Sequence, residues 1–204
     1  NVAIIAGAGP MGLGHIDYAL HGPRRPKLLV VTDIDPGRLA RAEAIHTPRH
    51  AAELGTRLLY VNTRGVEDVA GRLRGLTQDD HGYDDVFVLA PVTPLVEQAD
   101  ALLAFDGCLN FFAGPTDKGF SARINFYEVH YGMHHIVGTS GGNTEDMRIS
   151  LRLMSEGKLN PAAMITHVGG LDCAVEAILS LPKIPGGKKL IYTHKRMPLV
   201  AIED

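Results

Sequence analysis

The sequence predicts a doubly wound α/β fold, in which a parallel sheet carries helices on both faces. Short apolar runs alternate five times with helical patterns over about the first 115 residues. These runs lack the period of two that a sheet with one face in water would show, so they are typical of buried strands. The first run also leads directly into a glycine-studded turn and then a helix. Buried strands joined by helices indicate parallel pairing with right-handed crossovers.

The expected strands cover residues 2–6, 28–32, 58–61, 86–89, 109–112 and 135–137. Between them we expect helices from the glycine turn through Leu20, over 35–45, near 66–75 and over 92–104. A longer helix follows from Thr144 to about Glu156, where Asn143 could cap the first turn. The segment 120–131 is aromatic and rich in His and shows no clear element.

The last fifty residues differ in pattern. Residues 161–165, a helix over 172–181 and a strand over 189–192 carry apolar faces. We expect no further strand-helix-strand repeat here, and no partner strands for this tail within the chain.

Length and composition bound the class of protein. The 204 residues suffice for one sizeable soluble domain, or one and a half small ones. Twenty Lys and Arg against 23 Asp and Glu give a net charge of −3, which supplies no basic field for nucleic acid or an anionic membrane. Two cysteines cannot build a disulfide framework, and no apolar run is long enough to span a bilayer. We therefore expect a cytoplasmic protein that binds a small molecule.

The 23 glycines are the unusual count, about 11% against a usual ~7%. Six residues, Gly7-Ala8-Gly9-Pro10-Met11-Gly12, form a G-x-G-x-x-G motif after the first strand and at the head of a helix. In such a motif Gly7 permits a tight turn, Gly9 lets a pyrophosphate approach the backbone, and Gly12 lets the helix pack against the strand. The helix N-terminus then offers free N–H groups to the phosphates. The alternative is a plain turn that uses glycine for geometry alone.

Asp33 ends the second strand, 21 residues after Gly12. A carboxylate there can accept both ribose hydroxyls of an adenosine and would repel a 2′-phosphate, which favours NAD over NADP. The alternative role is that of a carboxylate at a helix N-terminus. Four basic residues weaken the preference, since any of them could lie beside a 2′-phosphate: Arg24, Arg25, Lys27 and Arg38.

The chain shows a coenzyme cradle but no evident catalyst. A Tyr-x-x-x-Lys pair is absent, because Tyr131 and Arg196 follow Tyr127 and Tyr192 by four residues. Three clustered histidines lack a carboxylate or Cys at ligand spacing, which favours contact with substrate or coenzyme, or a wet loop, over metal binding: His130, His134 and His135. Cys108 and Cys173 are interpreted as small core residues. No catalytic residue and no metal ligand is therefore predicted in this chain.

Several runs together resemble the C-terminal part of the zinc-dependent medium-chain alcohol and polyol dehydrogenases. The runs are 2–12, 31–33 with Arg38, 112–115, 138–142, 160–167 and 187–191, so the resemblance covers essentially the whole chain. The runs 110–117 and 181–189 are most similar to the L-sorbose 1-phosphate reductase branch of that family.

The resemblance implies a Rossmann sheet of order 3-2-1-4-5-6 over residues 1–140. It implies that the segment 141–204 returns to complete a GroES-like catalytic domain, which holds the zinc and is missing here. By the family's pattern, Gly7, Gly9, Pro10, Met11 and Gly12 would hold the pyrophosphate, Asp33 and Arg38 the ribose, and Ala90 would lie under the ribose. Phe112, Ala113, Thr139 and Ser140 would hold the nicotinamide amide. Lys189 would contact the pyrophosphate, or be an exposed lysine that begins a strand.

These observations lead to two hypotheses of function. The first is the coenzyme-binding fragment of an NAD(P)-dependent zinc enzyme that interconverts a ketose and a polyol, including L-sorbose 1-phosphate and a hexitol phosphate. A substrate phosphate could meet Lys118, Arg123 and His130, or these could be solvated loop charges. The second is a stand-alone NAD(H)-sensing module without catalysis. The resemblance also implies a homodimer joined at the strand near 133–138.

Overall fold

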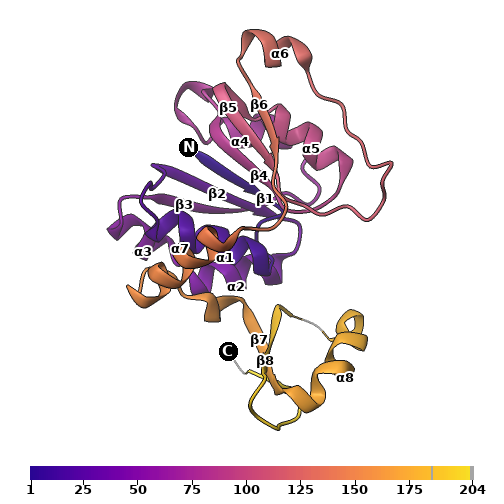
Figure 1. Ribbon diagram of the computed structural model, residues 1–204. Helices are drawn as coiled ribbons and strands as arrows, with labels where there is room; N and C mark the ends of the chain where they lie inside the picture. The colour runs from indigo at the N-terminus through magenta and orange to yellow at the C-terminus, as the bar shows by residue number, and fades with distance from the viewer. Residues whose placement is uncertain (185, 203–204) are drawn as a thin grey trace.

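The computed structural model describes residues 1–184 and 186–202 and contains a six-stranded parallel sheet (Figure 1). Its strands are β1 (Val2–Ile5), β2 (Leu28–Asp33), β3 (Arg57–Asn62), β4 (Tyr83–Val88), β5 (Leu103–Phe111) and β6 (His135–Gly138). They lie in the order β3-β2-β1-β4-β5-β6, as predicted, and every pairing is parallel. The order reverses between β1 and β4, which is where such sheets open a crevice for ligands.

Eight α-helices accompany the strands in the described part of the chain. They are α1 (Pro10–His21), α2 (Pro36–Ile45), α3 (Pro48–Glu53), α4 (Val69–Arg74), α5 (Thr93–Asp100), α6 (Phe126–Tyr131), α7 (Thr144–Ser155) and α8 (Ala174–Leu179). Short 3₁₀ turns cover Gln78–Asp80, Pro161–Met164, Leu171–Cys173 and Leu181–Lys183. Asn143 caps α7 as predicted, and Asp146 completes the capping box. Helices α3 and α6 were not predicted.

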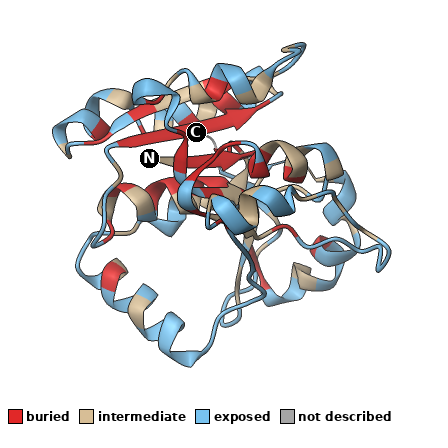
Figure 2. Cartoon of the chain, turned by 90° about the horizontal axis from the view of Figure 1, so that it is seen from above, coloured by how far each residue is buried: buried red, intermediate tan, exposed pale blue. Residues whose placement is uncertain are grey.

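Alternate residues of the central strands enter two different cores. Ala3 and Ile5 of β1 pack with residues of α4 and α5 on one face of the sheet. Ile4, between them, packs with residues of α1 and α3 on the other face. In Figure 2 the buried strands lie between helices whose outer surfaces are exposed. Burial on both faces explains why the strand sequences read as continuous apolar runs.

One helix boundary was predicted wrongly. The expected helix over 92–104 ends at Asp100, and β5 already begins at Leu103. Leu102 and Leu103 are buried in the sheet's core, and Leu103 pairs with Tyr83. The two cysteines are half-buried and not core residues. Cys173 lies at the start of α8, where its thiol donates to the carbonyl of Gly170 at 3.2 Å.

The tail forms a small sheet of its own, which corrects the expectation that it has no partner strands. Its strands β7 (Ile165–Gly170), β8 (Lys188–Tyr192) and β9 (Val200–Ala201) lie in the order β8-β7-β9, below the main sheet in Figure 1. Strands β7 and β8 pair in parallel with α8 between them, so a further strand-helix-strand unit does exist. The apolar side of α8 is open, with Val175, Ile178 and Leu179 exposed.

Candidate functional site

The predicted coenzyme residues of the Rossmann sheet all lie at its carboxyl edge. Gly7 follows β1, Asp33 ends β2, Ala90 follows β4, Phe112 follows β5 and Thr139 follows β6. Parallel strands end at a common edge, so the topology gathers residues that are far apart in sequence. The structure therefore brings the predicted sites together at the crevice between β1 and β4.

The glycine turn achieves its shape differently from the prediction. The left-handed backbone conformation falls at Ala6, with φ 54°, and not at Gly7. Gly7 is needed for space, because a Cβ there would lie 2.5 Å from Ile4 Cγ2. Its N–H donates to the carbonyl of Thr32 at 2.7 Å, which ties the turn to β2.

The other two motif glycines have contrasting surroundings. A Cβ on Gly12 would lie 1.7 Å from the carbonyl oxygen of Gly7, so α1 packs against the turn at a distance only glycine allows. A Cβ on Gly9 would meet nothing within 4 Å. Gly9 is the N-cap of α1, and no side chain caps this end of the helix. The turn thus leaves open backbone at a helix N-terminus, where an anion is stabilised.

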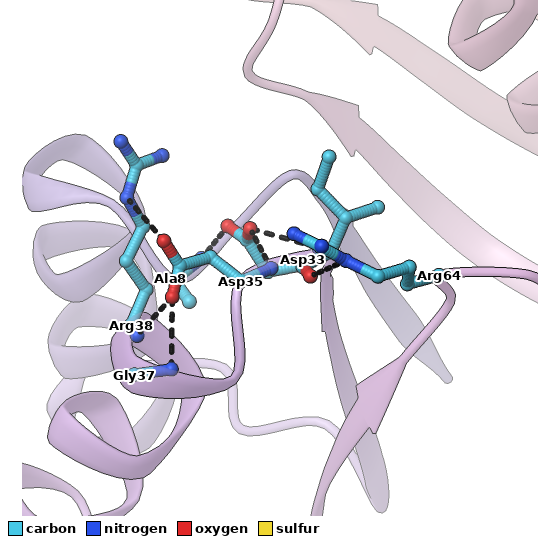
Figure 3. Close-up of polar contacts among 7 residues, drawn as sticks. Ala8, Asp33, Asp35, Gly37, Arg38 and Arg64 are labelled. Atoms are coloured by element: carbon cyan, nitrogen blue, oxygen red, sulfur yellow. Dashed lines mark hydrogen bonds and ion pairs between the residues drawn. The ribbon is translucent and has the colours of Figure 1, made fainter.

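Asp33 is fixed by backbone donors at the end of β2. Its Oδ1 accepts from the N–H groups of Ile34 and Asp35 at 2.8 and 3.1 Å, and its Oδ2 accepts from Ala8 at 3.3 Å (Figure 3). The contact with Ala8 joins β2 to the glycine turn. The cap of α2 is Asp35, whose Oδ1 accepts from Gly37 and Arg38. The alternative role of Asp33 as a helix-terminal carboxylate therefore falls to Asp35.

Two arginines lie near Asp33 at the carboxyl edge of the sheet. The Nε of Arg38 lies 4.0 Å from Asp35 Oδ2, and its side chain is exposed. Arg64, just after β3, donates from Nε to the carbonyl of Ile34 at 2.9 Å (Figure 3). The backbone hydrogen bond from Arg38 is the largest cause that lowers the pKa of Asp35, and the charges of both arginines lower it further. Sequence reasoning missed Arg64, although a residue that follows a strand must lie at this edge.

The other basic candidates lie elsewhere. Arg24, Arg25 and Lys27 precede β2, so they lie at the amino edge of the sheet, opposite the glycine turn. The suggestion that they could lie beside a 2′-phosphate is wrong, because a parallel sheet separates the residues before a strand from those after it.

The residues after β5 and β6 form the far side of the crevice. The N–H groups of Phe112 and Ala113 both donate to the carbonyl of Val88, at 3.1 and 3.0 Å. The Phe112 ring meets the edge of His15 on α1, with centroids 4.8 Å apart. The Oγ1 of Thr139 donates to Asn110 Oδ1 at 3.1 Å, while Ser140 beside it is exposed. His15, whose Nδ1 lies 2.8 Å from the carbonyl of Met11, was not predicted.

Lys189 comes close to the glycine turn from the tail. Together with Pro10, Met11 and residues of α8 it lines a cavity of about 470 Å³. Its Nζ donates to the carbonyl of Gly187 at 2.8 Å. The tail thus places Lys189 in a cavity that Pro10 and Met11, at the start of α1, also line.

The three residues that were candidates for binding a substrate phosphate, Lys118, Arg123 and His130, do not form one site. Arg123 is held by Glu97 through three contacts of 3.2 Å, and this ion pair lowers the pKa of Glu97. His130 packs against Tyr131 in α6, which precedes β6 and so lies at the amino edge. Lys118 is exposed.

The three clustered histidines have separate partners. His135 Nε2 lies 2.8 Å from Asp106 Oδ1, His134 is buried 3.8 Å from Asp100, and His130 faces Tyr131. Across residues 1–184 and 186–202, no three His, Cys, Asp or Glu side chains are placed to hold a metal ion. The same residues contain no helix long and apolar enough to cross a membrane.

Curated relatives match the whole chain. It is 57% identical over 204 residues to the mannitol-1-phosphate 5-dehydrogenase of Aliivibrio fischeri, and 51% identical to the L-sorbose 1-phosphate reductase of Klebsiella pneumoniae. These alignments cover all of this chain and 48% of each relative, so the chain spans about half the length of the curated relatives it matches. The resemblance to polyol dehydrogenases is confirmed. No model of a known protein family matches the chain.

Solved structures of dehydrogenases share the fold. The 2R,3R-butanediol dehydrogenase of Bacillus subtilis superposes with a TM-score of 0.73 at 22% identity, over 95% of this chain and 51% of that chain. An Escherichia coli alcohol dehydrogenase complexed with NADH superposes with a TM-score of 0.67 at 16% identity, over 99% and 52%. A zinc-binding dehydrogenase of Sinorhizobium meliloti bound to NADP gives 0.67 at 21%, also over 99% and 52%. The chain therefore shares its fold with one part of each of these dehydrogenases, and that part makes up about half of each dehydrogenase chain.

Proposed function

We propose that this chain is the coenzyme-binding part of a cytoplasmic NAD(P)-dependent oxidoreductase that interconverts a ketose phosphate and a polyol phosphate. The observation that carries the proposal is the open, uncapped N-terminus of α1 at Gly9, with the fixed carboxylate of Asp33 beside it. An anion fits the first feature and a ribose the second, so the site matches the pyrophosphate and the ribose of an adenosine diphosphate group.

Each residue of the crevice has a role in this proposal. The N–H groups at the head of α1 bind the pyrophosphate, and Lys189 neutralises part of its charge. Asp33 carries one acceptor position that its three backbone donors leave unused, and this position accepts a ribose hydroxyl. Phe112, Ala113, Thr139 and Ser140 hold the carboxamide. The bound coenzyme supplies the hydride, and the chain orients it.

The substrate and the metal are inferred from the relatives. Two relatives are named for mannitol 1-phosphate and L-sorbose 1-phosphate, which supports a polyol phosphate as the substrate class. The described residues of this chain do not fit a three-ligand zinc site, so no step through zinc is derived from them. We place the zinc and the proton relay in the half of the relatives that this chain does not span.

A stand-alone NAD(H) sensor is the second candidate. It would explain a coenzyme cradle without a catalyst. The names of the curated relatives favour the enzyme, since both describe catalysed reactions. Helix α8 also has an exposed apolar side, with Ile178 65% and Leu179 76% exposed. This side favours the enzyme hypothesis, because it suits a further protein surface that packs against α8.

Coenzyme titration tests the proposal. We expect the purified protein to bind NADH more tightly than NADPH, measured by calorimetry and by the change in NADH fluorescence. The Asp33→Asn variant keeps an oxygen for the backbone donors and loses the charge. It should bind NADH at least tenfold more weakly, with an unchanged circular dichroism spectrum. A wild-type preference for NADPH would contradict the role of Asp33, and binding of neither would contradict the proposal itself.

We also propose a homodimer joined at β6. Among the described residues this strand pairs with β5 alone, and all four of its residues are exposed, including Ile136 and Val137. An open edge with apolar side chains is suited to pairing with a second copy about a two-fold axis. Sedimentation should give a dimer, and Val137→Lys should give a monomer because it places a charge on the exposed apolar edge. A wild-type monomer at micromolar concentration would contradict this proposal.

A further inference from the structure

One imidazole connects the two sides of the coenzyme crevice. His15 lies in the second turn of α1, the helix that follows β1. Its ring meets the ring of Phe87 on β4, with centroids 5.4 Å apart and an interplanar angle of 62°. It also meets the ring of Phe112, which follows β5, with centroids 4.8 Å apart and an angle of 79°. Because the strand order reverses between β1 and β4, His15 spans the point at which the crevice opens.

These ring contacts hold the three side chains in a fixed relationship. Both are edge-to-face, an arrangement that aromatic rings prefer because the positive edge of one ring meets the negative face of the other. His15, Phe87 and Phe112 are all half-buried. The three rings are therefore not enclosed in the core, and they reach the surface at the carboxyl edge, where Phe112 follows β5.

The Nδ1 atom of His15 ties these rings to the head of α1. It lies 2.8 Å from the carbonyl oxygen of Met11, one turn earlier in the helix. A carbonyl oxygen can only accept, so Nδ1 carries the hydrogen and donates it. This bond fixes the imidazole over the first turn of α1. A phenylalanine at this position would keep the ring contacts and lose the bond.

Met11 and Phe112 belong to different parts of the proposed coenzyme site. Met11 lies in the glycine motif at the head of α1, where we place the pyrophosphate. Phe112 is one of the residues that we propose hold the carboxamide of the nicotinamide. Its backbone is fixed because its N–H donates to the carbonyl of Val88 at 3.1 Å, whereas its side chain meets the ring of His15. His15 therefore connects the pyrophosphate part of the site to the nicotinamide part.

We propose that His15 is a positioning residue for the nicotinamide end of the coenzyme. It holds the Phe112 ring in one orientation, and the nicotinamide lies against the surface that this ring provides. Hydride transfer needs the reacting atoms in a narrow range of geometries, so a small displacement of that surface matters. This inference deepens the proposed function and rests on it.

The same helix contains a matched histidine away from the crevice. His21 Nδ1 lies 3.0 Å from the carbonyl oxygen of Asp17, again one turn earlier in the helix. Its ring also lies near another ring, that of His50, with centroids 5.7 Å apart. His21 ends α1, whereas the crevice lies at the start of this helix. It therefore shares the local contacts of His15 without the position of His15.

Two ligands separate the parts of the coenzyme site. NADH carries both the pyrophosphate and the nicotinamide, whereas ADP-ribose carries the pyrophosphate and lacks the nicotinamide. Both would be titrated by calorimetry into wild type, His15→Ala, His15→Phe and the control His21→Ala. The emission spectrum of bound NADH reports on the surroundings of the nicotinamide, and the thermal midpoint of each variant shows that it is folded.

We expect the two ligands to respond differently to His15→Ala. Its NADH affinity should fall about three- to tenfold, as for the loss of an aromatic contact, while its ADP-ribose affinity stays within about twofold of wild type. The emission of bound NADH should shift toward that of free NADH, because water reaches the nicotinamide. His15→Phe should lie closer to wild type in both measurements, since it keeps a ring against Phe112. His21→Ala should match wild type.

Equal NADH affinity in wild type and His15→Ala would overturn this inference. So would an equal fall in the affinities for NADH and ADP-ribose, because His15 would then support the glycine turn and not the nicotinamide end. Both results leave the proposed function intact, since wild type still binds the coenzyme. Failure of wild type to bind either ligand is a distinct result, which would overturn the proposed function and this inference with it.

Discussion

The backbone N–H of Asn160 donates to Asp17 Oδ2 at 2.7 Å, across 143 residues of the chain. Asp17 lies in α1 and is 6% exposed, and its Oδ1 accepts from His21. The tail also packs on α1 near Gly14, where a Cβ would lie 2.9 Å from the Met164 sulfur. One buried carboxylate thus fixes the point at which the tail returns to the coenzyme helix.

Replacing this carboxylate should weaken the whole fold. Asp17→Ala removes the acceptor of the Asn160 N–H and of His21, and an unpaired buried polar group costs about 1–3 kcal/mol. We expect the free energy of unfolding to fall by about that amount, measured by urea denaturation followed by circular dichroism. The exposed Glu67→Gln serves as the control and should change little. Equal stability of Asp17→Ala and wild type would show that water replaces the lost contacts.

The glycine turn allows stability and coenzyme binding to be separated. In Gly12→Ala the new Cβ meets the carbonyl of Gly7, so we expect a loss of more than about 2 kcal/mol of stability from overpacking. In Gly9→Val the new side chain meets no protein atom near its Cβ, so the thermal midpoint should fall much less than in Gly12→Ala, by the loss of a favourable N-cap residue alone. NADH affinity should nevertheless fall at least tenfold in Gly9→Val, as measured by calorimetry. Unchanged affinity there would contradict the location of the pyrophosphate.

The main sheet was predictable because its signals are local. Each strand is buried on both faces and so reads as an apolar run, and the glycine motif marks the first crossover. The tail was harder because α8 and two 3₁₀ turns separate β7 from β8 and β9 has only two residues, so nothing local marks these strands as partners. Helix α3 has six residues and begins at Pro48 after Thr47, a cap signal too brief for periodicity to support.

The sequence could also have predicted at which edge of the main sheet each basic residue lies. Arg24, Arg25 and Lys27 come before β2 and Arg64 comes after β3, so chain order alone divides them between the two edges. The role of Asp35 as the α2 cap was also readable from the Pro36 that follows it. By contrast, the cavity that Lys189 shares with Pro10 and Met11 depends on how the tail packs, which no local pattern encodes.

Arg64 should affect which coenzyme the site accepts. Its Nε is anchored on Ile34 at the ribose side of Asp33, where a 2′-phosphate would lie. We expect Asp33→Asn to gain affinity for NADPH, because the repelling charge is lost, and Arg64→Gln added to it to remove most of that gain. NADH affinity should be the same with and without Arg64→Gln, measured by fluorescence titration. Arg57→Gln, at the start of β3 and so at the amino edge, is the matched control.

An unaffected NADPH affinity in the double variant would assign the 2′-phosphate to Arg38 instead. The two arginines can be compared because both lower the pKa of Asp35 by their charge, so both lie near the same carboxylate. Arg38→Gln in the Asp33→Asn background would then show the loss that Arg64→Gln does not.

His46 should make stability depend on pH. It is buried with no hydrogen-bond partner at Nε2, and burial lowers its pKa below the usual value of about 6.5, while Asp17 opposes the shift. Between the lowered folded pKa and 6.5, the unfolded chain binds a proton that the folded chain does not. Stability is therefore fully present above about pH 6.5 and is lost as the pH falls below it. We expect the free energy of unfolding to drop between pH 7.5 and pH 5.5.

The contribution of His46 to that drop can be isolated with His46→Gln, which cannot titrate in this range. The drop should be smaller in this variant than in wild type, whereas His81→Gln, at an exposed position, should retain it in full. A variant that keeps the wild-type drop would contradict the assignment of the pH dependence to His46.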